Sequence, residues 1–70
     1  SNAYYKIENN EMVFDHLLNI DTINVYDIRG RLIYKTKKKR LPLVKLENKP
    51  YLIYIETDNK TINFKFLNTN

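Results

Sequence analysis

The chain has 70 residues, of which 43% are hydrophobic and none is cysteine, and its formal net charge is +4. This length supports one small domain with a thin core and excludes a cleft enzyme with its own cofactor domain. The composition also excludes a disordered chain, a disulfide framework, a thiolate metal site and a membrane-spanning helix. Ser1, Asn2 and Ala3 resemble the remainder of a cleaved expression tag, so we expect a single domain over residues 4–70.

The first part of this domain carries apolar residues at alternate positions over short runs, a pattern typical of strands. Strands are expected over residues 4–7 and 11–14, with Met12 and Phe14 on one face of the second. Residues 15–21 fit either a helical turn or a continued strand, and we favour strand and loop. No segment shows the periodicity of an amphipathic helix.

A β-hairpin is expected next. Residues 22–28 and 31–35 alternate as strands on either side of a short turn. Asp27 can accept backbone N–H groups at the first turn position. Gly30, the only glycine in the chain, can adopt the positive φ that a type I turn with a bulge requires. These residue types at this spacing predict a tight turn.

A short segment over residues 41–46 follows the hairpin. Pro42 places it at a sheet edge, because proline cannot donate to a central ladder. Such an open edge could pair with a second copy of the chain, so a homodimer is one expected partner arrangement. The residues of this segment expected to face inward are Leu41, Leu43 and Leu46.

Two further strands are expected over residues 50–57 and 61–67, joined by a polar turn. Both faces of the first are apolar, which indicates either a central strand or an outer face that a partner covers. Residues 68–70 are expected to be a frayed end. Tyr51, Ile53 and Ile55 share one face of the first strand and are predicted to build the core. Ile62, Phe64 and Phe66 share one face of the second strand.

Six or seven short strands therefore recur along the chain, at a spacing of about ten residues. This pattern predicts an all-β fold, either a small antiparallel β-sandwich or a partly open barrel.

The chain carries little material for catalysis. Its only serine lies in the tag-like segment, and Asp15–His16 is the one acid–imidazole neighbourhood. These two residues are adjacent in sequence and have no nucleophile, so we interpret His16 as exposed in a loop. One histidine with scattered carboxylates does not supply a metal site, and one glycine does not supply a phosphate-binding loop. We therefore predict a non-enzymatic protein without a cofactor, metal or small-molecule substrate.

The positive charge is concentrated in the tract Lys37, Lys38, Lys39 and Arg40, and the rest of the chain is neutral. The tract could contact phosphate, contact anionic lipopolysaccharide or lipid headgroups, or form a solvated loop. We favour the solvated loop. Nucleic-acid binding is disfavoured because aromatic residues are not interleaved with the charges.

The hairpin sequence Ile23-Asn24-Val25-Tyr26-Asp27-Ile28-Arg29-Gly30-Arg31-Leu32-Ile33 resembles the C-terminal sorting domain of type IX secretion cargo. That family shows apolar–x–apolar–Tyr–Asp–x–x–Gly–Arg–apolar–apolar here, then a Gly–x–Tyr–x–apolar–x–apolar strand. Lys49-Pro50-Tyr51-Leu52-Ile53-Tyr54-Ile55 matches the second motif except at the family's glycine. Phe64-Lys65-Phe66-Leu67 resembles the closing strand, in which apolar residues flank a lysine.

The resemblance implies an immunoglobulin-like sandwich at the C-terminal end of a larger exported protein. It implies a sorting signal that the outer-membrane translocon recognises and that a sortase-like protease usually removes. The cargo would cross the periplasm of a Gram-negative bacterium and be secreted or attached to the cell surface.

The matched residues divide into three groups of expected roles. Tyr26, Asp27, Gly30 and Arg31 form the hairpin motif, and Tyr51, Ile53 and Ile55 form the core of the central strand. The residues expected to be read by the translocon are Lys65, Phe66 and Leu67.

Two other functions remain open at this point. A stand-alone immunoglobulin-like adhesion or accessory module of a surface protein would share the fold. A small basic barrel that binds nucleic acid is the weaker alternative, and its affinity would fall steeply with salt.

Overall fold

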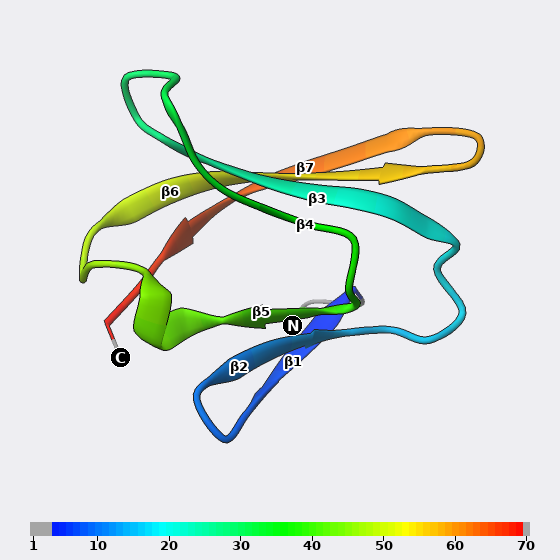
Figure 1. The fold of residues 1–70 in the computed structure, drawn as a ribbon, viewed down its shortest axis with the longest axis horizontal. Coiled ribbons are helices and arrows are strands. Elements are labelled where there is room, and N and C mark those ends of the chain that lie inside the picture. Colours follow the sequence, from blue (N-terminus) through cyan, green and yellow to red (C-terminus); the bar gives the residue numbers. More distant parts are fainter. Residues whose placement is uncertain (1–3, 70) are drawn as a thin grey trace.

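The expected strands are present, and they form two antiparallel sheets that pack face to face (Figure 1). The computed structural model describes residues 4–69, so the tag-like Ser1–Ala3 lies outside the described residues. The elements in chain order are β1 (Tyr5–Glu8), β2 (Glu11–Phe14), β3 (Ile20–Asp27), β4 (Leu32–Thr36), β5 (Arg40–Pro42), the 3₁₀ turn η1 (Leu43–Lys45), β6 (Pro50–Thr57) and β7 (Thr61–Leu67). The predicted all-β sandwich is confirmed.

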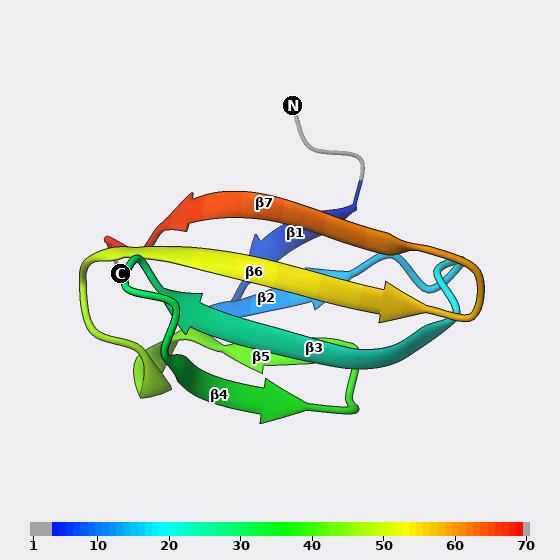
Figure 2. The same ribbon diagram turned by 90° about the horizontal axis from the view of Figure 1, so that it is seen from above.

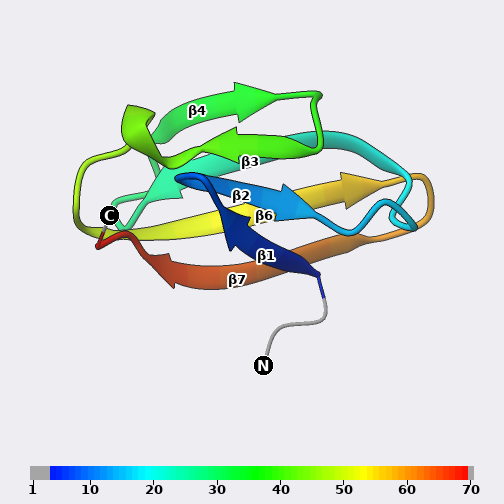
Figure 3. The same cartoon turned by 90° about the horizontal axis from the view of Figure 1, so that it is seen from below.

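The two sheets differ in size. The smaller one has the strand order β1-β2-β5, and the larger one has the order β4-β3-β6-β7. Figure 2 shows the four-stranded sheet in front, and Figure 3 shows the three-stranded sheet in front. Hairpins join β1 to β2, β3 to β4 and β6 to β7, while the segments before β3, β5 and β6 pass from one sheet to the other.

Strand β6 is central, as the apolar character of both its faces predicted. It pairs with β3 on one side and with β7 on the other. The alternating side chains of both sheets meet between the layers and form one core. The buried core consists of Met12, Phe14, Ile23, Val25, Leu41, Leu43, Leu46, Tyr51, Ile53, Ile55 and Ile62.

The segment after β5 is a short 3₁₀ turn rather than a continued strand. The Leu43 N–H bonds to the Asn10 carbonyl, and the Leu46 N–H bonds to the Leu43 carbonyl. This turn places Leu43 and Leu46 in the core, as expected for inward-facing residues. Strand β5 itself is an edge strand and contains Pro42, so the predicted edge position is confirmed.

Residues 15–21 form turns and then the start of β3, in agreement with the favoured strand and loop. Within residues 4–69, no helix is long and apolar enough to cross a membrane.

The prediction of a frayed end is wrong for Asn68. This side chain is buried, with 1% exposure, and it makes several hydrogen bonds to the body of the domain. The next residue, Thr69, is exposed, and Asn70 lies outside the described residues.

Candidate functional site

The carboxylate of Asp27 organises the turn between β3 and β4. Its Oδ1 accepts hydrogen bonds from the backbone N–H groups of Arg29 and Arg31, at 2.9 and 3.0 Å. Its Oδ2 accepts a bond from Arg31 Nε at 2.8 Å. The Gly30 N–H closes the turn on the Asp27 carbonyl. Asp27 therefore holds the turn by contacts within four residues of itself.

The Asp27 carboxylate and the backbone conformation of Gly30 both stabilise this turn. Asp27 is 3% exposed, and the pKa of its carboxyl group is held below the ordinary 3.8, chiefly by the Arg31 backbone N–H. Burial opposes this lowering, while the Arg31 side chain and the Arg29 N–H add to it. Gly30 has φ +84°, in the region that glycine adopts without strain. The structure thus places Asp27, Gly30 and Arg31 together, as the hairpin motif predicted.

Tyr26 belongs to the same motif but lies on the outer face of the four-stranded sheet. Its ring meets the ring of Tyr54 edge to face, with centroids 5.4 Å apart. Both tyrosines are half-buried. The residue therefore covers the outer surface of β3 and β6 rather than the core.

The central-strand residues Tyr51, Ile53 and Ile55 are all buried in the core, as predicted. The Tyr51 hydroxyl also accepts a hydrogen bond from the Glu47 N–H at 2.9 Å, which ties down the loop before β6. Pro50 begins this strand opposite Leu67. The Asn68 N–H bonds to the Lys49 carbonyl, so the Pro50–Leu67 pair is a non-hydrogen-bonded one. Pro50 therefore costs β6 no bond to β7. The family's glycine position, two residues before this tyrosine, is occupied by Lys49.

Asn68 is a structural residue that the sequence did not reveal. Its side-chain NH₂ donates to the carbonyls of Leu43, Leu46 and Glu47, at 3.3, 3.2 and 3.2 Å. Its own Oδ1 is buried and accepts no hydrogen bond from the described residues. All three acceptors lie more than twenty residues away in sequence. No local pattern around Asn68 could have identified these contacts.

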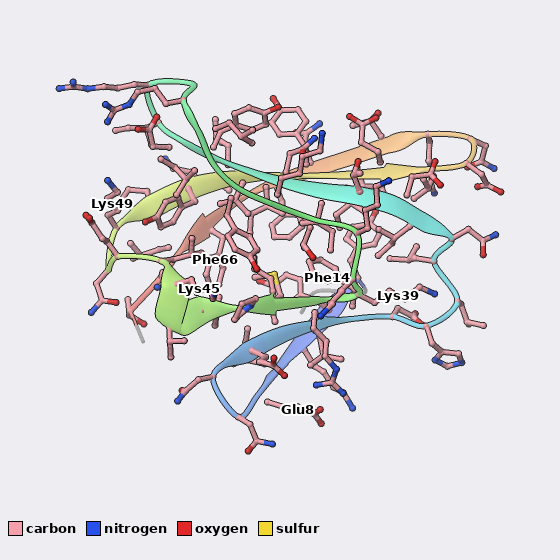
Figure 4. All side chains as sticks on the ribbon, viewed as in Figure 1. Glu8, Phe14, Lys39, Lys45, Lys49 and Phe66 are labelled. Carbon is pink, nitrogen blue, oxygen red and sulfur yellow. The ribbon has the colours of Figure 1, made fainter. Side chains whose placement is uncertain are left out.

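The last strand presents two different sets of side chains. Phe66 points between the sheets and packs edge to face on Tyr5 (Figure 4). Lys65 and Leu67 point outward and are exposed. Of the residues expected to be read by a partner, Lys65 and Leu67 are thus accessible, whereas Phe66 serves mainly in packing.

One edge of β7 has unpaired backbone groups. The Asn68–Lys49 and Thr57–Lys60 backbone hydrogen bonds show which residue pairs of β6 and β7 are hydrogen-bonded and which are not. Alternate residues of β7 then direct their N–H and C=O groups toward β6, and the others direct them away. No backbone group of residues 4–69 bonds to the second set. Its members are Thr61, Asn63, Lys65 and Leu67.

Two residues of the basic tract 37–40 contact other parts of the domain, and the other two are exposed. Arg40 Nη1 lies 2.8 Å from Glu11 Oε1, and Lys39 Nζ donates to the His16 carbonyl at 3.0 Å. Lys37 and Lys38 are exposed in the loop between β4 and β5. Two of the four cations are therefore engaged within the domain.

The Asp15–His16 pair lies on the surface. The His16 side chain is 89% exposed, and its Nδ1 is 3.7 Å from the Asp15 carboxylate. Among residues 4–69 there is no group of three or more His, Cys, Asp and Glu side chains that could hold a metal ion.

The chain is thus a small antiparallel β-sandwich whose charged groups lie on turns, edges and outer faces. The family model of the secretion system C-terminal sorting domain matches residues 1–68, so the chain belongs to this family. The chain matches none of the curated proteins and none of the solved structures with which it was compared.

Membership gives the general function. The domain is a C-terminal sorting signal for type IX secretion, and this role involves the type IX secretion machinery. It belongs to an exported protein that is secreted or attached to the surface. The family indicates a non-catalytic role.

Proposed function

We propose that this domain directs a preceding cargo from the periplasm of a Gram-negative bacterium through the type IX outer-membrane translocon. In this proposal the translocon reads β7 and its exposed residues Lys65 and Leu67. A sortase-like protease then removes the domain as the cargo is released or attached to anionic lipopolysaccharide. The family match over nearly the whole chain is the observation that carries the proposal.

The unpaired edge of β7 supports the assignment of this strand as the docking element. Seven residues in extended conformation present alternate backbone donors and acceptors, the arrangement by which a sheet takes up a further strand. Lys65 projects beside this edge and adds a positive charge, while Leu67 is 60% exposed and adds an apolar contact. By contrast, β5 offers an edge of only three residues, one of them Pro42. A homodimer through residues 41–46 stays a prediction, which sedimentation at increasing concentration would test.

The basic tract stays predicted as a solvated loop, and Lys37 and Lys38 are the residues that would carry a contact with an anionic surface. They are exposed, while Lys39 and Arg40 have partners within the domain. Such a contact predicts that replacing both by glutamine weakens attachment to anionic lipid vesicles without changing the thermal midpoint.

An export assay tests the main proposal. Residues 4–70 are fused behind a folded reporter with a periplasmic signal peptide, in a bacterium that has type IX secretion. Reporter in the medium or on the surface, lost when the translocon is deleted, is the expected result. A reporter that stays folded in the periplasm would contradict the proposal and favour a stand-alone surface module.

Lys65→Ala tests the role of β7 within the same assay. The side chain is exposed and forms no ion pair within residues 4–69, so the variant should fold like the parent. We expect export to fall. Lys60→Ala is the matched control, because it removes the same charge from the exposed β6–β7 turn. Equal export of Lys65→Ala and the parent would remove Lys65 from the docking element.

A further inference from the structure

A cationic hollow lies beside the β3–β4 turn, where β6 begins. Its volume is about 400 Å³. Three of the lining side chains carry a positive charge and one carries a negative charge. The lining residues are Asp27, Ile28, Arg29, Arg31, Lys49 and Pro50. They come from two segments of the chain, so the hollow exists only in the folded domain.

The one carboxylate in this lining is used internally. The Asp27 side chain is 4% exposed, and its oxygens accept the three hydrogen bonds that hold the turn. Apart from its backbone N–H, Arg31 is bound to this carboxylate only through Nε, and the Arg31 side chain is 66% exposed. The guanidinium is therefore fixed in orientation while its two terminal NH₂ groups remain free to donate to another molecule.

The other two cations increase the positive charge of the hollow. Arg29 forms no ion pair with any residue from 4 to 69. Lys49 Nζ lies 3.5 Å from the carboxylate of Glu47, which is itself 82% exposed, so solvent screens this pair strongly. The hollow thus combines one oriented guanidinium with two further cations that the domain does not neutralise by buried contacts.

We propose that this hollow binds a carboxylate side chain from an acidic segment of a protein partner. The planar fork of a guanidinium matches a carboxylate in two parallel hydrogen bonds. Ile28 and Pro50 supply apolar wall beside the cations, which suits the methylene groups of a glutamate. A hollow also admits a projecting side chain, whereas a flat anionic membrane would contact cations that stand out from the surface, as Lys37 and Lys38 do.

This site is formed by the β3–β4 turn and the start of β6, whereas the proposed docking element is the neighbouring outer edge of β7. The proposed carboxylate binding rests on the proposed function in one respect, namely that the partner belongs to the secretion machinery. The hairpin motif then has two roles, because the buried Asp27 that sets the turn also positions Arg31 for recognition.

Binding by the purified domain is measured first, with a short oligoglutamate peptide as the probe and nuclear magnetic resonance as the readout. The test variant is the double replacement Arg29→Gln and Lys49→Gln, which leaves the Asp27–Arg31 contact intact. Its matched control is Lys35→Gln with Lys60→Gln, which removes the same charge from exposed side chains of β4 and of the β6–β7 turn. We expect the test variant to bind about tenfold more weakly than the parent. The control should bind like the parent, and thermal midpoints should show that both variants fold.

Three outcomes would overturn the inference. The first is equal loss of binding in the test and control variants, which would indicate net charge alone. The second is absence of oligoglutamate shifts at the β3–β4 turn of the parent domain at low salt. The third is stronger binding of inorganic phosphate or anionic lipid vesicles than of oligoglutamate, with the same dependence on Arg29 and Lys49.

The export assay separates this inference from the proposed function. If the parent domain exports the reporter and the Arg29→Gln, Lys49→Gln variant exports it less, the carboxylate site takes part in sorting. If the parent exports the reporter and this folded variant does so equally well, the inference fails and the proposed function stands. If the parent itself is not exported, the proposed function fails, and the oligoglutamate measurement still decides the binding site.

Discussion

Asp27 and Asn68 are the two buried polar side chains found in the described part of the chain, and they lie at the same end of the sandwich. Asp27 ends β3 opposite Tyr51, and Asn68 follows β7 with its N–H bonded to the Lys49 carbonyl. The first few residues of β6 therefore lie between them. Each satisfies backbone groups that the strands leave unpaired, but they do so over very different sequence distances.

The Asp27 contacts span two to four residues, whereas the Asn68 contacts span 21 to 25 residues. A local contact forms as soon as its turn forms, and it restricts the conformation of only a few residues. A long-range contact forms only after both sheets have assembled, because loop closure must come first. Asp27 therefore stabilises one turn, whereas the Asn68 contacts form only in the complete fold and stabilise it as a whole.

The largest effect is expected from Asn68. Asn68→Ala removes the donor for the buried contacts to the Leu43 and Leu46 carbonyls and for the part-buried contact to the Glu47 carbonyl. It should lower the free energy of unfolding by about 3 kcal/mol. Asn68→Asp should cost more, since it buries an acceptor against these carbonyls. Chemical denaturation measures both. Thr69→Ala, at an exposed neighbour, is the control, and a similar small loss in all variants would contradict the long-range role of Asn68.

Gly30→Val tests the local turn. No heavy atom other than those of its chain neighbours lies within 4 Å of a Cβ placed there, so the cost comes from φ +84° alone. A β-branched residue in this conformation should lower the free energy of unfolding by about 1–2 kcal/mol. Gly30→Asn should cost less, because asparagine tolerates the left-handed region. Thermal denaturation of the pair checks the ranking, and equal midpoints would rule out backbone strain as the cause.

Tyr51→Phe sharpens the comparison, since this hydroxyl acts on the same loop as Asn68. The change leaves the Glu47 N–H without its acceptor and keeps the ring in the core. We expect a loss of about 1 kcal/mol in the free energy of unfolding. Tyr54→Phe on the outer face is the control. Hydrogen exchange at Glu47 should become faster only in Tyr51→Phe, and unchanged protection there would contradict the bond.

Acid provides the mildest test of the Asp27 turn. Because the folded-state pKa of Asp27 is lowered, its contribution to stability is complete above the ordinary value of 3.8 and is lost as the pH falls through the folded pKa. Asp27→Asn should therefore be less stable than the parent at neutral pH, and the difference should shrink below about pH 4. A difference that stays constant from neutral to acid pH would mean that the charge of Asp27 does not stabilise the turn.

Much of the fold could be predicted from the sequence where the signal is local. The bounds of β2, β6 and β7 agree with the expected ranges, because period-two alternation ends at clear polar turns. The Asp27–Gly30 turn was predictable because it requires only contacts near in sequence. The alternation also identified Tyr51, Ile53 and Ile55 as one buried face.

The candidate site was predictable only in part. Motif residues in the turn and the exposure of Lys65 followed from the pattern, but the packing of Phe66 against Tyr5 required both ends of the chain. The same holds for the basic tract, in which Arg40 and Lys39 find partners on residues 11 and 16. Lys49 joins the arginines of the hairpin only because β6 pairs with β3.

Alternation and turn chemistry act within a few residues, and therefore the all-β class, the central strand and the tight hairpin could be predicted from the amino-acid order alone. Only the folded structure shows which strands share a sheet, that Asn68 is buried, and that Arg29, Arg31 and Lys49 line one hollow. These features depend on contacts between segments far apart in the chain. Such contacts become favourable only when the two sheets close over a common core, and no local pattern encodes them.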